Sequence, residues 1–321
     1  MQRKTLFTLC AAAVVATSAL GLATARPASL MASMNWKGTA SRDWNDRDNW
    51  TGGSVPAAGD TVTIPSSVPG GYQGDPVLDS GDDGLAGTLN IASNRSVTVT
   101  GKMLTLDGAV THDIDGDIFL KNDVSNNSVL KVTGADATLD IAGTGSVVLE
   151  ASNARLDLDA DVTVSGAGEI VGQHNDAEIQ VATDKVLTNS LSIVGKMKIA
   201  GPGKLDNRGL VHANANGPLT LDSNLIVVDT SGDRWKASID SGAIFVFDGA
   251  IACDNLAGNF ILDGCSTFRF NATVYTSGSF TTGDGFVDVN PDDASVSFNY
   301  SCNSGCSSCT TVDSDTSYGS C

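Results

Sequence analysis

Residues 138–149 have the sequence TLDIAGTGSVVL, and this stretch decides the fold class. Polar and apolar side chains alternate over residues 138–141, Gly143-Thr144-Gly145 interrupts the alternation, and Val147-Val148-Leu149 forms a second apolar run. Alternation with a period of two is typical of a β-strand with one buried face, and closely spaced glycines are typical of a turn. The stretch therefore predicts two short strands joined by a tight turn.

Short runs of this kind recur along the chain, about every 8 to 12 residues, between Gly, Asn, Asp and Ser. They lie at residues 61–64, 97–99, 104–106, 118–120, 130–132, 138–141, 147–149, 156–158, 162–164, 179–181, 191–193, 219–221 and 244–246. Apolar residues at helical spacing are absent from any long window after the first 25 residues. The chain is therefore predicted to be all-β.

Two all-β architectures place short strands at this spacing, an antiparallel β-sandwich and a parallel β-solenoid. The runs are more numerous than one sandwich normally holds, and glycine pairs beginning at Gly143, Gly166 and Gly201 precede successive runs. Their separation, roughly 20 to 35 residues, matches the length of a coil or a pair of coils. We expect a right-handed parallel β-solenoid (β-helix) over residues 71–300, and the antiparallel β-sandwich is the alternative.

The first 25 residues have the features of a secretory signal peptide. Basic residues open the chain at Arg3 and Lys4, and an apolar segment follows from Leu6 to Leu22. Ala23-Thr24-Ala25 fits the small-x-small pattern of a cleavage site, and a second possible site ends at Ala32. Because the apolar segment is at the lower limit for crossing a bilayer, we expect removal of residues 1–25 and no membrane span afterwards. The mature protein is expected to be secreted or held at the cell surface.

The chain is strongly acidic, with a formal net charge of −18. Such a surface repels phosphate backbones and anionic lipid headgroups, and it attracts hard cations such as Ca²⁺. Nucleic acid is therefore not an expected partner. Extracellular polysaccharide and other surface proteins remain the candidate partners.

Six of the seven cysteines follow the signal segment, and an even number in an exported chain predicts disulfide bonds. These residues are Cys253, Cys265, Cys302, Cys306, Cys309 and Cys321. Cys253 and Cys265 bracket a short strand-like stretch, which favours a bond between them. The other four lie in or next to a cysteine-rich tail at residues 301–321, where we expect them to pair with one another rather than bind zinc.

Trp44 and Trp50 begin a stretch that continues through Pro56 and Gly59-Asp60 into the first strong strand. This pattern resembles the opening cap of many bacterial surface β-solenoids, and it is similar to the start of the G8 domain, a glycine-rich extracellular β module. Residues 203–211 and 213–221 resemble coils of autotransporter-type passenger regions. The resemblance implies a cap at residues 35–70 and an extracellular β-solenoid, and it brings no catalytic residues.

Three groups of residues are candidates for a site. Trp36, Trp44 and Trp50 would either close the open end of the solenoid or form a stacking platform for sugar rings, and we favour the cap. Asp113, Asp115 and Asp117 are a candidate Ca²⁺ site, although a surface turn is favoured because the ligand spacing departs from a calcium loop. The histidines, His112, His174 and His212, lie far apart and are expected on exposed turns or strand ends.

The sequence predicts a non-catalytic structural or adhesive protein. Catalytic residues and a cofactor are not expected, apart from the candidate Ca²⁺. A polysaccharide lyase or hydrolase of the β-helix type is one alternative, and it would need Lys or Arg beside acids, or two carboxylates across a sugar. A carbohydrate-binding module that uses the tryptophans is the other.

Overall fold

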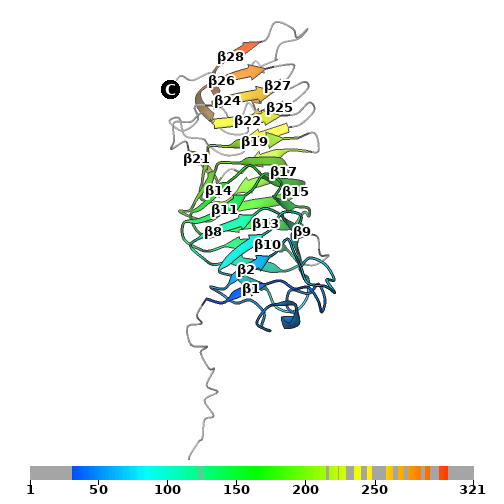
Figure 1. Ribbon diagram of the computed structural model, residues 1–321. Helices are drawn as coiled ribbons and strands as arrows, with labels where there is room; N and C mark the ends of the chain where they lie inside the picture. Colours follow the sequence, from blue (N-terminus) through cyan, green and yellow to red (C-terminus); the bar gives the residue numbers. More distant parts are fainter. Residues whose placement is uncertain are drawn as a thin grey trace, which may run out of the picture. The chain divides into compact units, whose positions relative to one another are not determined.

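The computed structural model describes residues 31–121, 123, 126–214, 217–222 and 224–228, and beyond these the strands β22 to β28. Every pairing between its strands is parallel, and the chain passes from strand to strand in successive coils (Figure 1). The predicted parallel β-solenoid is confirmed, and the antiparallel β-sandwich is wrong. An antiparallel contact occurs as an isolated bridge between Trp36 and Trp50. The right-handed sense of the coil stays a prediction.

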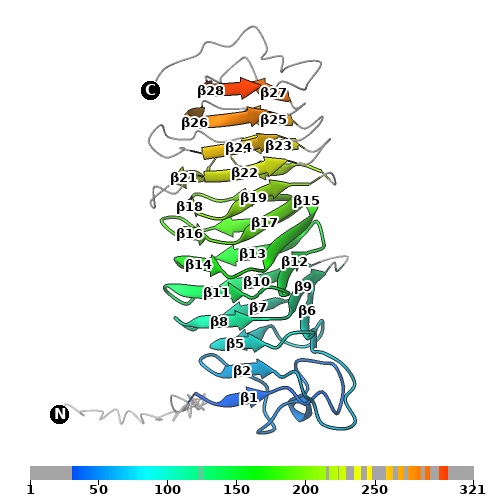
Figure 2. The same ribbon diagram turned by 45° about the horizontal axis from the view of Figure 1, so that its top comes forward.

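A nine-stranded sheet, called ladder A, receives one strand from each coil up to β21. Figure 2 shows these strands stacked one above another. They are β1 (Ser33–Asn35), β2 (Thr61–Ile64), β5 (Thr88–Ile91), β8 (Thr111–Ile114), β11 (Ala137–Ile141), β14 (Val162–Ser165), β16 (Val186–Asn189), β18 (Lys204–Asn207) and β21 (Ile226–Val228).

A nineteen-stranded sheet contains the other two strands of each coil, which stack as ladders B and C. Ladder B comprises β3 (Val77–Leu78), β6 (Ser96–Thr100), β9 (Asp117–Lys121), β12 (Ser146–Leu149), the first parts of β15 (Glu169–Val181) and β17 (Ser192–Ala200), β19 (Leu210–Ala213), β22 (Trp235–Ile239), β24 (Gly258–Leu262), β26 (Val274–Thr282) and β28 (Val296–Cys302). Ladder C comprises β4 (Gly84–Ala86), β7 (Met103–Leu106), β10 (Ser128–Val132), β13 (Ala154–Leu158), the second parts of β15 and β17, β20 (Leu219–Leu221), β23 (Ile244–Phe247), β25 (Thr267–Phe270) and β27 (Phe286–Val289).

The parallel register places the same residue type in the core in coil after coil. Ile64, Ile91, Ile114 and Ile141 form one such column on the inner side of ladder A. All four side chains are buried, and complete burial of an isoleucine stabilises a fold by about 1.5–3 kcal/mol. Alternation along each strand turns the remaining side chains outward. The core is therefore a stack of Val, Ile and Leu columns, as the alternating pattern predicts.

Glycines occupy the corners because successive coils approach too closely there for a side chain. A Cβ on Gly145 would lie 2.2 Å from the carbonyl oxygen of Ile114, and one on Gly168 would lie 2.4 Å from that of Gly145. A second corner column runs through Gly87, Gly108 and Gly134, where a Cβ would lie 2.4 Å or less from the nearest backbone atom of the preceding coil. The glycine pairs noted in the sequence therefore mark corners where coils are in backbone contact.

Trp36, Trp44 and Trp50 form a buried aromatic cluster at the N-terminal end of the described residues. Trp50 makes edge-to-face contacts with both other rings, with centroids 4.9 Å from Trp36 and 4.8 Å from Trp44. The indole of Trp50 donates to the carbonyl of Trp44 at 2.7 Å. The three side chains are at most 1% exposed, so they offer no ring face on which a sugar could stack.

Polar side chains hold the cap segment around the tryptophans. Asn49 ends the 3-10 helix η1 (Arg47–Asn49), and its buried amide accepts from the backbone N–H groups of Ala40 and Ser41, each at 3.0 Å. Asp60, the acid of the Gly-Asp pair, accepts from the N–H groups of Ala32 and Ala57 at 3.0 and 2.9 Å. The Gly-Asp element therefore ties the residue before β1 to the start of β2.

Some sequence predictions fall on residues outside this description. The signal segment 1–25 is one, and the cysteines Cys253, Cys265, Cys306, Cys309 and Cys321 are others; of Cys302 only its place at the end of β28 is described. Their pairing stays a prediction. Within the described residues, the structure contains no helix of the length and apolar character needed to cross a membrane.

Candidate functional site

The outer face of ladder B is the candidate functional site, because two hollows open on it. The first is about 290 Å³ and is lined by Gly143, Thr144, Gly145, Ser146, Ala167, Gly168, Glu169 and Ser192; we call it the Glu169 hollow. The second is about 350 Å³ and is lined by Val171, Gly172, Gln173, Lys196 and Asn214; we call it the Lys196 hollow. Strands β15 and β17 contribute to both.

The Glu169 hollow forms where the corner glycines leave space between coils. Gly145 and Gly168 carry no side chain and tolerate none. The corner between the coils therefore stays open, and the neighbouring polar residues border it. Ser146 pairs in register with Glu169, and Glu169 with Ser192, so their side chains form one outward row across three strands. The Glu169 carboxylate offers acceptors and the Ser192 hydroxyl a donor to a polar ligand, whereas the Ser146 hydroxyl donates to Asp117 at 2.6 Å.

Between the hollows lies an apolar row, two residues further along the same strands. Phe119, Val148, Val171 and Val194 occupy equivalent register positions in β9, β12, β15 and β17. Val148 is 6% exposed, and the other three are partly exposed. This row forms an apolar floor. The Glu169 hollow lies on one side of it, and the Lys196 hollow lies on the other.

A bulge in β15 shapes the rim of the Lys196 hollow. The register between β15 and β17 shifts between Gln173 and Glu178, and within this bulge Asn175 and Asp176 are exposed whereas Ala177 is buried. A Cβ on Gly217 would lie 2.8 Å from Asn175 Oδ1 and 2.9 Å from Lys196 Cδ, which places both side chains at this rim. Such bulges redirect side chains beside binding sites. The hollow therefore combines the Lys196 ammonium group with the amides of Gln173 and Asn214.

The two hollows differ in the charged groups that line them. Among the residues that line them, Glu169 alone carries a carboxylate, whereas glycoside hydrolysis uses two carboxyl groups placed across the sugar. Lys196 lines the other hollow, beyond the apolar row.

A second charged cluster, which sequence spacing does not reveal, lies on the outer face of ladder C. Arg155 is 2.9 Å from Asp157 on its own strand and 3.8 Å from Glu178, its register partner on β15. Lys131 is 2.6 Å from Asp159. Burial raises the pKa of the Asp157 carboxyl, and the adjacent Arg155 opposes that shift. These opposite charges pair across coils, and cross-strand pairs of this kind support the sheet.

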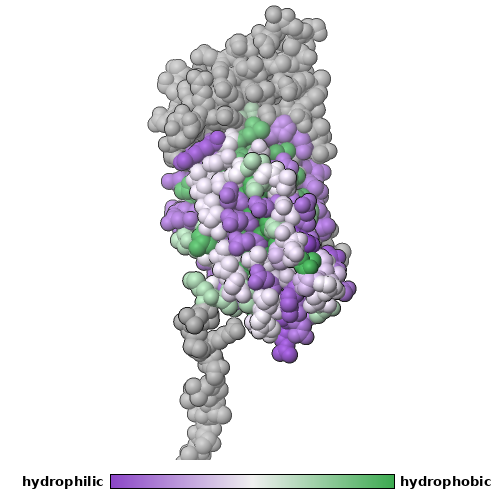
Figure 3. Space-filling model, viewed as in Figure 1, coloured by the Kyte–Doolittle hydropathy of each residue, from purple (hydrophilic) through white to green (hydrophobic). Residues whose placement is uncertain are grey.

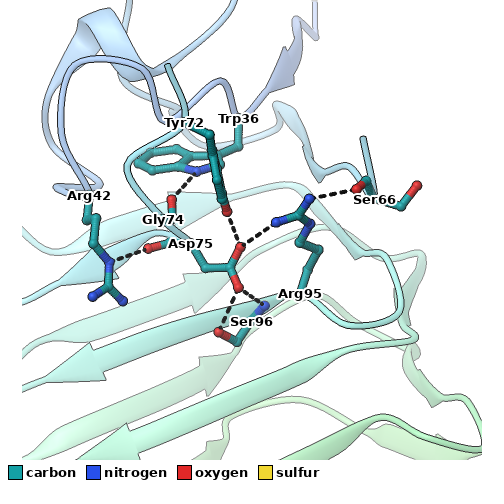
Figure 4. A network of polar contacts seen from close by, with 8 residues as sticks. All are labelled: Trp36, Arg42, Ser66, Tyr72, Gly74, Asp75, Arg95 and Ser96. Carbon is teal, nitrogen blue, oxygen red and sulfur yellow. Dashed lines mark hydrogen bonds and ion pairs between the residues drawn. The ribbon is translucent and has the colours of Figure 1, made fainter. Parts of the chain in front are cut away.

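A third polar cluster is centred on Asp75, which precedes β3 (Figure 4). Its carboxylate accepts from Tyr72, from Arg95 at 3.4 Å, and from the backbone and hydroxyl of Ser96 at 3.1 and 3.2 Å. Arg95 also donates to the carbonyl of Ser66 at 2.6 Å. Burial, and then the Asp75 carboxylate, raise the pKa of Tyr72 to about 12. The cluster fastens the connection between β2 and β3 to β6.

The structure places the candidate Ca²⁺ residues on two different ladders. Asp113 belongs to β8 in ladder A and Asp117 to β9 in ladder B, so the corner at Asp115-Gly116 sends their side chains to different faces. Asp117 accepts from Ser146 at 2.6 Å. In the part of the chain that the structure describes, no three His, Cys, Asp or Glu side chains are grouped as a metal requires.

The expectation that the histidines lie on exposed turns or strand ends is wrong for His112. Its side chain is fully buried in an inner column of ladder A, where it pairs in register with Leu139. Its Nδ1 accepts from the N–H group of Leu89 at 3.1 Å. Burial lowers the pKa of His112 to about 4, although the Gly108 backbone and the Asp107 charge act in the opposite direction.

The fold and these faces define the chain as a parallel β-solenoid with a buried aromatic cluster at the N-terminal end of the described residues. Residues 35–159 match the model of a domain of unknown function, DUF8693. The match extends from the end of β1 to just past β13, so it includes the cap, part of the Glu169 hollow and none of the residues that line the Lys196 hollow. Neither a curated protein nor a solved structure matches the chain.

Proposed function

We propose that the protein is an exported, non-catalytic adhesive or structural solenoid that binds neutral polysaccharide along ladder B. The observation that carries this proposal is the pair of hollows on one face, joined by an apolar row. A sugar chain presents hydroxyls and apolar C–H faces in succession, which suits polar hollows with a valine floor between them. The formal charge of −18 favours a neutral polymer over a polyanion.

Export and surface location belong to the same proposal. They are supported by the basic and apolar residues 1–25, by the even number of later cysteines, and by the resemblance of the cap stretch to those of bacterial surface β-solenoids and the G8 domain. The buried tryptophans favour the ladder B face over an aromatic platform as the place where sugar binds. Figure 3 shows that hydrophobic residues (green) on the visible face are scattered among intermediate (white) and hydrophilic (purple) ones.

Binding to neutral β-glucans, measured by affinity electrophoresis and calorimetry, tests the proposal. Lys196→Ala should weaken binding by at least about tenfold, since a hydrogen bond to a charged group contributes about 1.5 kcal/mol or more. Glu169→Gln should also weaken it. The matched control is Lys204→Ala, an exposed lysine at the start of β18 on ladder A, and it should bind like the wild type.

Two results would contradict the proposal. Equal loss of affinity in Lys196→Ala and Lys204→Ala would show that the effect is one of net charge rather than of the hollow. Release of shortened oligosaccharides by the purified protein would replace the adhesive role with the polysaccharide-processing alternative, and Arg155 with its two carboxylates would then be the first residue to substitute.

A further inference from the structure

A row of threonines runs along the outer face of ladder A, away from the hollows. Thr61 pairs with Thr88, Thr138 pairs with both Thr111 and Thr163, and Thr163 pairs with Thr188. Asn90 pairs with Asp113, which aligns Thr88 with Thr111. The row therefore contains one threonine from each of six successive strands, from β2 to β16, and Ser33 of β1 extends it by one more hydroxyl. Figure 2 shows these strands directly stacked.

The hydroxyls of this row are available to solvent. Among the described residues, threonine hydroxyls that form hydrogen bonds belong to Thr51, Thr133 and Thr144, all outside the row. Thr111 is exposed, and the other five are partly exposed, as expected for outward side chains between neighbours in a ladder. A threonine contributes a methyl group and a hydroxyl held in few rotamers, because its β-carbon is branched. The row is thus a rigid line of free hydroxyls.

The spacing within the row is set by the backbone. Adjacent strands lie about 4.8 Å apart, so the hydroxyls repeat at that distance along the solenoid. The oxygen atoms of hexagonal ice repeat along the a axis at a closely similar distance. The row is also uncharged in a protein with 37 acidic residues, and uncharged side chains interrupt the hydrogen-bond network of ordered water least. Each hydroxyl both donates and accepts hydrogen bonds, so water molecules bound along the row repeat at the spacing of the strands.

We propose that the threonine row of ladder A binds ice. The ligand is the regular oxygen lattice of an ice surface, and each threonine hydroxyl occupies one lattice position. The adjacent outward row consists of Thr63, Asn90, Asp113, Asp140 and Ser165. The uncharged surface that would contact the ice lattice is therefore two residues wide at β2. It narrows to one residue at β8 and β11, because Asp113 and Asp140 occupy the adjacent row there. The row ends at Asp206, which is buried and pairs with Arg208 at 2.8 Å.

Thermal hysteresis and inhibition of ice recrystallisation test this proposal in the full chain. Thr111→Tyr places a bulky, uncharged ring of good β-propensity in the middle of the row, and most of the activity should be lost. Thr105→Tyr makes the same change on the outer face of ladder C and should keep the wild-type activity. Circular dichroism and thermal unfolding of both variants show whether the solenoid is retained.

A gain of function provides an independent test. The double substitution Asp113→Thr, Asp140→Thr widens the uncharged face over β8 and β11, and it should raise thermal hysteresis above the wild-type value. Absence of activity in the wild type, equal loss in Thr111→Tyr and Thr105→Tyr, or no gain in the double variant would overturn the proposal. Binding of the row to insoluble cellulose without any effect on ice would overturn it as well. The ice measurements do not involve Lys196 and leave the ladder B proposal untouched, whereas binding of cellulose by the threonine row would also count against ladder B as the polysaccharide-binding face.

Discussion

At the scale of single residues, polar groups inside the solenoid have specific partners. His112 occupies a core column in which the coil before contributes Leu89 and the coil after contributes Leu139. Its Nδ1 accepts the N–H group of Leu89, so the buried imidazole is neutral and that nitrogen is unprotonated. The alternating pattern would have placed an apolar residue here. A buried histidine cannot be told from an exposed one by sequence spacing, which is why the prediction failed.

His112 should make the folded state sensitive to acid. Its pKa is about 4 when folded and 6.5 when unfolded, so between these values the unfolded chain binds a proton that the folded chain does not. The free energy of unfolding should therefore fall as the pH drops from about 6.5 to about 4. His112→Asn keeps an acceptor for the Leu89 N–H group, and urea unfolding should show a flatter pH dependence in this variant. Thr111→Asn exchanges one neutral side chain for another on the same strand, so it is the control and should keep the wild-type slope.

At the scale of elements, the stacking of coils depends on the corners. Gly143 and Gly145 belong to the same turn, yet they differ in what a side chain would meet. A Cβ on Gly145 would lie 2.2 Å from the Ile114 carbonyl oxygen, whereas one on Gly143 would be 3.8 Å from its nearest neighbour, Ala167. The turn was predictable from the sequence. Only the structure shows which of these glycines contacts the backbone of the preceding coil.

Gly145→Ala should therefore destabilise the solenoid, and Gly143→Ala should not. Forcing an additional methyl group into a packed site costs about 1–3 kcal/mol, and we expect a loss in this range for Gly145→Ala. Gly143→Ala should change the free energy of unfolding by less than about 1 kcal/mol and could stabilise it, because alanine restricts the unfolded chain. Chemical denaturation of both variants checks the pair, and equal effects would argue against backbone contact at this corner.

At the scale of the whole molecule, the sequence predicted the strands and the class of fold. Each short apolar run identified in the sequence overlaps a strand, because alternation with period two depends only on neighbouring residues. The candidate functional face was not predictable in this way. Ser146, Glu169 and Ser192 come together only because coils of about 25 residues stack in register. Coil length varies along the chain, so this register cannot be read from the sequence.

The central claim is that neutral polysaccharide lies along ladder B. Hydroxyl-radical footprinting with and without a bound β-glucan tests it most directly, because it reports which side chains the polymer covers. We predict protection of Phe119, Val171 and Val194 on ladder B, with Leu85 and Met103 of ladder C unchanged. Protection of the ladder C residues instead, or no protection at saturating polymer, would contradict the account.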